Sequence, residues 1–118
     1  MGKINLVAEL ISDDENLNIN TTGIKSNNRI VYKENDISVT ILIHDNKIEM
    51  NRSCNEYKIS LVFEKNKNTI SKYQLFGSNK VFDLGTLTKK LDISDNEINL
   101  EYELEGNSFK YKLEMEDL

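Results

Sequence analysis

Arg52 is the residue whose type and position offer the most chemistry, because it is a cation at an inward position of a predicted strand. Ile48 and Met50 precede it at the same parity, on the face that should be buried. An arginine stays charged at any working pH, so a buried one needs a partner. Glu34 has the inward parity two strands earlier, and two long side chains can bridge the roughly 10 Å across the strand between them. We therefore predict an Arg52–Glu34 ion pair at one end of the fold.

Three roles for Arg52 follow from this position. The pair can be structural, closing one end of the fold with help from the hydroxyl of Tyr32 or Tyr73. Arg52 can instead receive the carboxylate or phosphate of a ligand, or extend into water at the rim. The apolar tail of such a ligand would lie against Ile41, Met50 and Leu61. The residues of this candidate ligand site are Tyr32, Glu34, Arg52 and Tyr73.

The other reactive side chains lack the partners that catalysis or metal binding requires. His44 is the one histidine and stands beside the Asp45-Asn46 turn, where we expect it to be exposed. Cys54 lies near a strand end and is expected to be a small, semi-buried apolar residue. The acidic run at residues 13–15 lacks the glycine and spaced ligands of a calcium loop. Phosphate-binding glycine loops, nucleophile elbows and zinc motifs are absent, so we expect no metal or cofactor, and an enzyme is the least favoured class of function.

Composition narrows the classes of partner. The net charge is −5 with lysines interspersed among acids, and no basic stripe is present to bind nucleic acid or an acidic membrane. The longest apolar run is Ile41 to Ile43, far short of a spanning helix. One cysteine allows no intramolecular disulfide, and no signal peptide is recognisable. We expect a soluble, cytoplasmic protein that is a monomer or a homodimer.

A period of two dominates the chain and predicts strands with one buried face. The pattern is clearest near the C-terminus, where residues 98–104 and 109–115 alternate apolar and polar side chains. If Gly106 and Asn107 form a type II′ turn, the two strands form a hairpin. Its predicted apolar pairs are Leu104 with Phe109, Tyr102 with Tyr111, Leu100 with Leu113 and Ile98 with Met115. On the other face, Glu103 would meet Lys110 and Glu101 would meet Lys112.

Earlier strands are predicted in the same way. The first hairpin turns at residues 12–15 and pairs Leu10 with Leu17 and Ala8 with Ile19. Val7 and Ile11 leave part of its second face apolar, so either the chain or a second copy should cover that face. A meander then turns at Asn35-Asp36 and at Asp45-Asn46. Its predicted pairs are Tyr32 with Val39, Ile30 with Ile41, Ile43 with Ile48, Ile41 with Met50 and Val39 with Arg52.

The stretch from Val81 to Ile93 is harder to interpret because its apolar residues change parity. Strands at residues 57–63 and 71–75 lead into it through the turn at Gly77 and Ser78. Phe82 and Leu84 hold one parity, whereas Leu87, Leu91 and Ile93 hold the other. A β-bulge at Gly85 explains the change, and a helical turn at residues 87–91 is the alternative.

Together these elements predict an all-β fold with little helix and a single domain over residues 1–118. Neighbouring strands are joined by tight loops, which indicates an antiparallel up-and-down meander of eight to ten strands. Closing the meander into a barrel would remove its exposed edges, so a barrel is favoured over a sandwich.

The order of several short segments resembles the YwiB-like bacterial proteins of unknown function. The matching pieces are Tyr32-Lys33-Glu34, Ile48 to Arg52, Tyr73 to Gly77 and the terminal strands with Leu100, Tyr102 and Leu104. The likeness covers most of the chain from Arg29 onward. It departs at Ser53-Cys54, where that family carries a glycine, and at Leu75-Phe76, where it carries a proline. The resemblance implies a calycin-like, lipocalin-like β-barrel and supplies no activity.

Two functions from different classes fit these expectations. In the first, the barrel is non-catalytic and binds a small apolar or amphipathic anionic molecule inside it or at its mouth. In the second, the barrel is filled by its own side chains and acts as a protein interaction or structural module, through a dimer face for example. Large inward residues such as Phe63 and Tyr102 argue against a spacious interior.

Overall fold

Ten antiparallel strands form a closed barrel in the computed structural model, which describes residues 2–118. The strands are β1 (Gly2–Ser12), β2 (Asn16–Ser26), β3 (Arg29–Glu34), β4 (Ile37–His44), β5 (Lys47–Ser53), β6 (Tyr57–Glu64), β7 (Asn68–Leu75), β8 (Lys80–Ile93), β9 (Glu97–Leu104) and β10 (Asn107–Asp117). Each strand pairs with its neighbours in sequence, and β1 closes the barrel against β10. The predicted up-and-down barrel is therefore confirmed. Within residues 2–118 no helix is long and apolar enough to cross a membrane.

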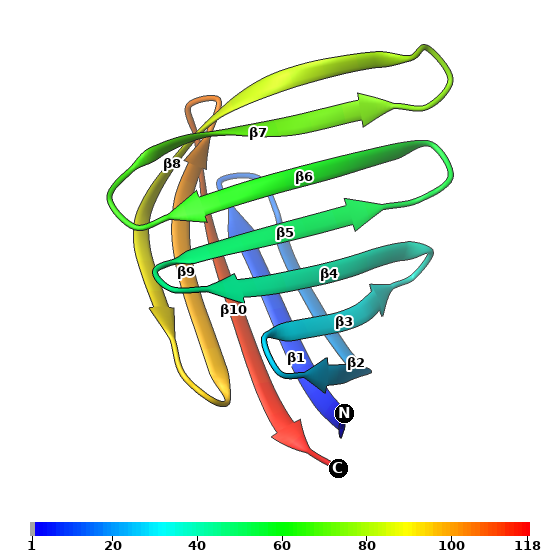
Figure 1. Ribbon diagram of the computed structural model, residues 1–118, viewed down its shortest axis with the longest axis vertical. Coiled ribbons are helices and arrows are strands. Elements are labelled where there is room, and N and C mark those ends of the chain that lie inside the picture. The colour runs from blue at the N-terminus through cyan, green and yellow to red at the C-terminus, as the bar shows by residue number, and fades with distance from the viewer. Residues whose placement is uncertain (1) are drawn as a thin grey trace.

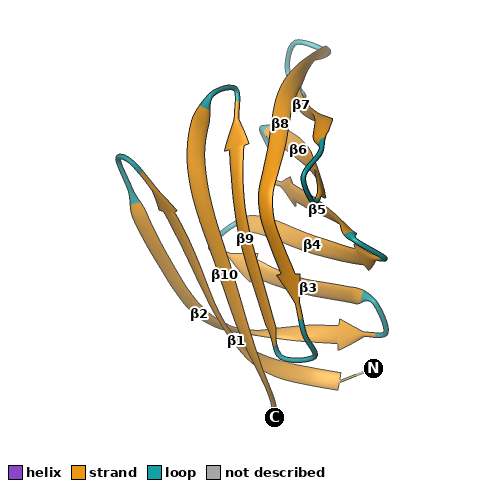
Figure 2. Cartoon of the chain, turned by 90° about the vertical axis from the view of Figure 1, so that its left-hand side faces the viewer, coloured by secondary structure: helices purple, strands orange, loops and turns teal. Residues whose placement is uncertain are grey.

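The barrel is flattened into two layers whose strands cross at a steep angle. Figure 1 shows β3 to β7 running across the view in the front layer, with β1, β2, β9 and β10 nearly upright behind them. The turned view of Figure 2 shows the same two layers edge on, with β8 curving along their junction. Long β8 therefore belongs to both layers and joins them.

Side chains fill the space between the layers. Phe63 is fully buried and its ring centroid lies 4.5 Å from that of Tyr102. Most strands supply alternate residues to this core, as their period of two predicts, whereas β2 and β7 supply no buried apolar residue. The buried apolar residues are Ile4, Leu6, Ala8, Ile30, Tyr32, Val39, Ile41, Ile48, Met50, Leu61, Phe63, Leu91, Ile98, Leu100, Tyr102, Tyr111, Leu113 and Met115.

Asparagine makes most of the tight turns. Five asparagines have a positive φ, a backbone conformation that asparagine tolerates better than most residues. They are Asn27, Asn35, Asn46, Asn66 and Asn79. The asparagine-rich composition therefore has a structural use in a chain without proline.

The predicted pairings of the first hairpin and the meander are confirmed. Leu10 lies opposite Leu17, Tyr32 opposite Val39, and Ile43 opposite Ile48. The pairing of Val39 with Arg52 is confirmed as well. In the meander, two-residue turns with asparagine or aspartate set the register.

The predicted register of the terminal hairpin is wrong by two residues. Tyr102 lies opposite Phe109, and Leu100 opposite Tyr111. The turn residues are Glu105 and Gly106, both with positive φ, which is the type I′ pattern. Backbone and side-chain bonds to Gly85 hold Glu105 there: its N–H donates to the Gly85 carbonyl at 2.9 Å, and its carboxylate accepts the Gly85 N–H at 3.2 Å. A shift by two keeps the parity, so the inward residues are those predicted.

The predicted bulge at Gly85 is also misplaced. β8 is a continuous strand of 14 residues, and its register against β9 shifts between Thr88 and Lys90. Lys89 is therefore the extra residue, and the inward parity changes from Thr88 to Leu91. The helical alternative at residues 87–91 is excluded, because those residues belong to the strand.

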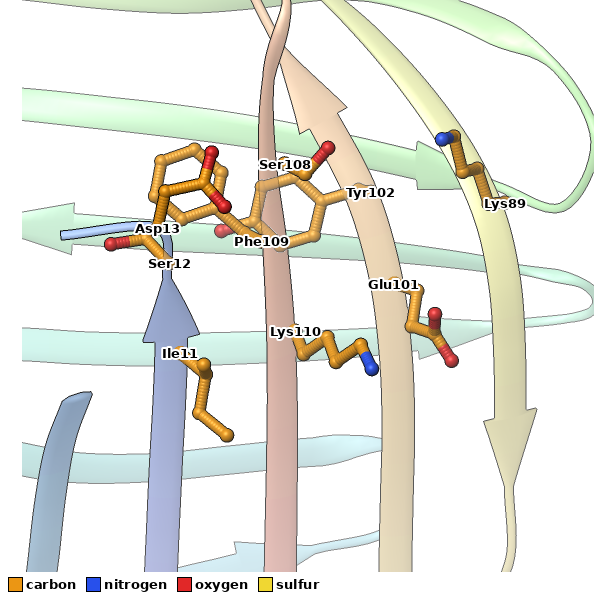
Figure 3. A pocket seen from close by; sticks show the side chains of 9 residues that line it. All are labelled: Ile11, Ser12, Asp13, Lys89, Glu101, Tyr102, Ser108, Phe109 and Lys110. Atoms are coloured by element: carbon orange, nitrogen blue, oxygen red, sulfur yellow. The ribbon is translucent and has the colours of Figure 1, made fainter. Parts of the chain in front are cut away.

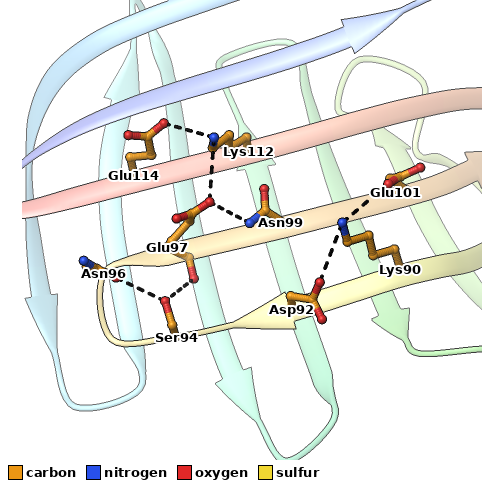
Figure 4. Close-up of polar contacts among 9 residues, drawn as sticks. All are labelled: Lys90, Asp92, Ser94, Asn96, Glu97, Asn99, Glu101, Lys112 and Glu114. Atoms are coloured by element: carbon orange, nitrogen blue, oxygen red, sulfur yellow. Dashed lines mark hydrogen bonds and ion pairs between the residues drawn. The ribbon is translucent and has the colours of Figure 1, made fainter.

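The outer face of β8, β9 and β10 carries alternating charges (Figure 4). Lys112 lies 3.7 Å from Glu97 and 3.4 Å from Glu114, and Lys90 lies between Asp92 and Glu101. These exposed pairs contribute little to stability.

Val7 on the outer face of β1 stays 40% exposed, so the chain leaves this predicted apolar position largely uncovered.

The barrel closes over a short seam between β2 and β3. Only residues 24–26 of β2 pair with residues 29–31 of β3. Beside the seam, a Cβ at Gly23 would lie 2.7 Å from the Val31 carbonyl oxygen and 2.8 Å from Leu6 Cδ2. The close approach of β2 to β3 therefore requires glycine at residue 23.

We expect Gly23→Ala to destabilise the protein by about 1 to 3 kcal/mol, because backbone at the seam must move. Urea unfolding followed by circular dichroism measures the loss. Gly77→Ala is the matched control, since a Cβ there meets no atom within 4 Å. Equal stability of the two variants would show that the seam tolerates a side chain at Gly23.

Candidate functional site

The mouth is the end of the barrel that holds Arg52. We define it by the β3–β4, β5–β6 and β7–β8 turns and the inward residues next to them. Figure 1 shows these three turns together at the right-hand side. The strands bring Arg52 beside Ile59, Ile59 beside Tyr73, and Tyr73 beside Phe82. One inward row therefore runs across the mouth from β5 to β8.

The predicted ion pair between Arg52 and Glu34 is present. Arg52 Nη1 donates to Glu34 Oε1 at 3.1 Å, and Nη2 donates to Oε2. This is the bidentate geometry that makes arginine–carboxylate pairs strong. The Glu34 side chain is 6% exposed and that of Arg52 is 15% exposed, so the carboxylate is buried and the guanidinium keeps access to water.

Two tyrosines extend this pair into a buried network. The Tyr32 hydroxyl donates to Glu34 Oε1 at 3.3 Å and lies 2.8 Å from the Tyr111 hydroxyl. Tyr32 belongs to β3 in the front layer and Tyr111 to β10 behind it. The network of Tyr32, Glu34, Arg52 and Tyr111 therefore joins the two layers. Tyr111 was not predicted as part of the site, because its place depends on barrel closure.

Burial and charge shift the pKa values of this network. Burial lowers the pKa of Arg52, but the hydrogen bond and charge of Glu34 more than offset it, and the pKa lies above its ordinary value. Burial raises the pKa of Tyr32, although its bond to Tyr111 acts in the other direction. Burial, reinforced by Tyr32, raises the pKa of Tyr111 well above its ordinary range. Burial also raises the pKa of Tyr102 to about 12.

An aromatic row continues the mouth beyond Arg52. The rings of Tyr57 and Tyr73 stack at 5.7 Å with an angle of 17°, and Phe82 follows 6.2 Å from Tyr73. Phe82 is 45% exposed, while Tyr57 and Tyr73 are half-buried. The hydroxyl that assists Glu34 is that of Tyr32, so Tyr73 lies in the aromatic row and outside the network. Tyr57 was missed as a site residue, although its inward parity at a strand start is a signal for the mouth.

The apolar residues predicted to hold a ligand tail belong to the packed core. Ile41 is fully buried, Met50 is 3% exposed and Leu61 is 5% exposed. They contribute to the filling of the barrel interior. The row from Arg52 to Phe82, in contrast, keeps part of its surface in water.

The other reactive side chains lie away from this network. His44 is exposed, as predicted, and its Nε2 lies 2.9 Å from Glu49 Oε2. Cys54 is half-buried, and its N–H donates to the Tyr57 carbonyl at 3.0 Å. The acidic residues 13–15 are exposed in their turn. Across residues 2–118, no group of three histidine, cysteine or acidic side chains could hold a metal ion.

An open cleft of about 250 Å³ is lined by residues of β1, β10, β9 and β8, among them the inward residues Tyr102 and Phe109 (Figure 3). Its wall includes Asp13, Lys89, Glu101 and Lys110. Lys89 pairs with Glu103 at 2.6 Å. Charges of both signs are mixed along this wall, so the cleft offers no clear preference for one class of ligand.

Removing Arg52 tests the network. We expect Arg52→Met to lower the free energy of unfolding by about 3 to 5 kcal/mol, because Glu34 then stays buried without its cation. The double variant Arg52→Met/Glu34→Leu should regain most of that loss in urea unfolding. A small loss in Arg52→Met would show that the fold does not need the pair.

The buried tyrosines predict sensitivity to alkali. Tyr102 has a folded pKa of about 12, whereas an unfolded tyrosine titrates near roughly 10. A raised folded pKa means that the stability contribution is complete below pH of about 10 and is lost as the pH rises through the folded value. For Tyr102 alone this amounts to about 2 to 3 kcal/mol.

Ultraviolet titration of tyrosinate should therefore show Tyr32, Tyr102 and Tyr111 ionising together with loss of the folded circular dichroism signal. Tyr102→Phe should remain folded to higher pH than the parent. Ionisation of all five tyrosines in the folded protein would contradict the buried network.

Comparison with known proteins supplies a family. A search of curated proteins found no match. Among solved structures, the chain is similar to the crystal structure of the ywiB protein from Bacillus subtilis, with a TM-score of 0.70 and 18% identity over 98% of this chain and 90% of that one. At this identity the likeness shows the shared barrel fold. The family model described as a domain of unknown function (DUF1934) matches residues 4–116, so the chain belongs to that family.

Proposed function

We propose that this protein is a non-catalytic barrel that binds a small amphipathic anion at its mouth. The observation that carries the proposal is the row in which partly exposed Arg52 is followed by Ile59 and then by Tyr73, whose ring stacks on Tyr57. A carboxylate or phosphate would bind the Arg52 guanidinium, and the apolar part would lie on Tyr57, Tyr73 and Phe82. Apolar and aromatic side chains beside a few placed polar groups are typical of small-molecule sites.

Glu34 does not use all of the N–H donors of Arg52, so others remain that such an anion could accept. A guanidinium has five N–H donors, and Glu34 accepts two of them in the network. The remaining donors are on the side chain that keeps 15% of its surface in water. Glu34 therefore holds the guanidinium in place, which lowers the entropy that a ligand must remove.

The packed interior supports a binding site at the mouth over one inside the barrel. Phe63, Tyr102 and the other buried residues fill the centre of the barrel. The site is a shallow one, and we expect modest affinity.

A single half-buried cysteine suits a reducing compartment, and the proposal includes a cytoplasmic location.

A pair of fluorescent probes tests the proposal. The anion 1-anilinonaphthalene-8-sulfonate carries a sulfonate on an aromatic body, and N-phenyl-1-naphthylamine is its neutral counterpart. We expect the folded protein to bind both, and Tyr73→Ala to weaken both by about fivefold, because one aromatic contact contributes roughly 1 kcal/mol. The double variant Arg52→Met/Glu34→Leu should weaken only the anion.

Ile70→Ala is the matched control for Tyr73→Ala, since Ile70 lies on the same strand and is 56% exposed. Equal effects of the two substitutions, or an absence of probe binding to the folded parent, would refute binding at the mouth.

The packed interior also supports a second candidate, a filled barrel that acts as a protein interaction module. In that case the mouth network is structural, and the function lies on an outer surface. The probe titrations separate the two, because the module gives no specific binding at the mouth.

A further inference from the structure

Most of one edge of β2 has no partner strand within residues 2–118. Residues 16–25 of β2 pair with β1 on one side, but only residues 24–26 pair with β3 on the other. The edge over residues 16–23 therefore presents unpaired backbone N–H and C=O groups at alternate positions. Figure 2 shows the β1–β2 hairpin standing apart from the front layer over this length. We call residues 16–22 the open edge.

The open edge lacks the features that protect exposed strand edges. Proteins usually place charges, proline or a bulge there to prevent pairing with another chain. Residues 16–24 contain no charged residue and no proline, in a chain that is 30% charged. Among the other strands, β4 alone also lacks Lys, Arg, Asp and Glu, and β4 is paired on both sides. The open edge therefore shares with β4 an uncharged composition that does not oppose pairing with a further strand.

The side chains of the open edge complement a second copy of themselves. A strand that pairs antiparallel with itself about a two-fold axis sets residues of equal parity opposite one another. Centring the axis on Ile19 uses the whole open edge. It places Ile19 opposite its own copy, Leu17 opposite Thr21, Asn18 opposite Asn20, and Asn16 opposite Thr22. On the inward face Ile19 then meets its own copy between two Leu17–Thr21 pairs, and on the outward face uncharged polar residues meet, with no like charges opposed.

The exposure of Leu17 and Ile19 also supports a second copy of the chain as the partner of the open edge. Leu17 is 41% exposed and Ile19 is partly buried, both on the inward face of the open edge. A second strand beside them would cover part of that surface and continue the back layer of the barrel. We propose that the open edge of β2 is a homodimer interface, in which two copies of the chain pair antiparallel about Ile19 into one continuous sheet. This proposal uses residues outside the mouth, so it does not depend on the proposed function.

Sedimentation equilibrium over a wide concentration range is the first test. A seven-residue strand pair makes a small interface, so we expect a dimer of twice 13.6 kDa with a dissociation constant in the range of roughly micromolar. Asn18→Lys/Asn20→Lys places two lysine pairs face to face and should weaken the dimer at least roughly tenfold. Asn51→Lys is the control for added charge, because β5 is paired on both sides.

Disulfide trapping tests the register in a Cys54→Ser background. The two-fold axis sets residue 19 against its own copy, so Ile19→Cys should form a disulfide-linked dimer under mild oxidation. Asn18→Cys should do so far less readily, because it lies opposite Asn20 of the other copy. Circular dichroism confirms that each variant is folded.

A parent protein that stays monomeric at all concentrations would overturn the proposal. So would a dimer that survives Asn18→Lys/Asn20→Lys, because its interface must then lie elsewhere. Trapping through Asn18→Cys in preference to Ile19→Cys would overturn the register. None of these outcomes bears on probe binding at the mouth, so the two proposals can fail independently.

Discussion

The hydrogen bond between Tyr32 and Tyr111 connects the two layers of the barrel at the point where the buried charge lies. The 2.8 Å contact joins β3 to β10, which lie in opposite layers. Tyr32 also donates to Glu34, whose carboxylate holds the Arg52 guanidinium. A buried polar network is stable when its members are satisfied, and removing one leaves the others without partners. The position of each residue at the mouth therefore depends on closure of the whole barrel.

Closure itself depends on few residues. The seam between β2 and β3 has three residue pairs, compared with nine between β1 and β10. The backbones approach closely at Gly23, directly beside Tyr32. The Tyr32–Tyr111 bond therefore supplements a seam that has few ladder hydrogen bonds. Beyond Gly23 the strands diverge, and the same divergence creates the open edge of β2.

The sequence predicts the parts of this fold that local chemistry determines. The alternation of residues 30–52 predicts the inward parity of Arg52 and Glu34, and the Asn35-Asp36 and Asp45-Asn46 turns determine their strand register. Their ion pair could be predicted for that reason. The terminal register could not, because Glu105 takes a positive φ that its contacts with Gly85 support. Tyr111 could not be placed either, since nothing local indicates that β10 faces β3.

The Arg52–Glu34 pair is linked to the proposed function by the difference in exposure between its two side chains. A pair that served stability alone could be replaced by apolar residues of similar volume without loss. Here the Glu34 side chain is 6% exposed, whereas the Arg52 side chain keeps 15% of its surface in water. The buried carboxylate fixes the orientation of a cation that solvent can reach, and the proposed binding of an amphipathic anion would use this fixed cation together with the aromatic rings of the same row. The network thus gives a single physical reason for both the packing of the mouth and its proposed binding role.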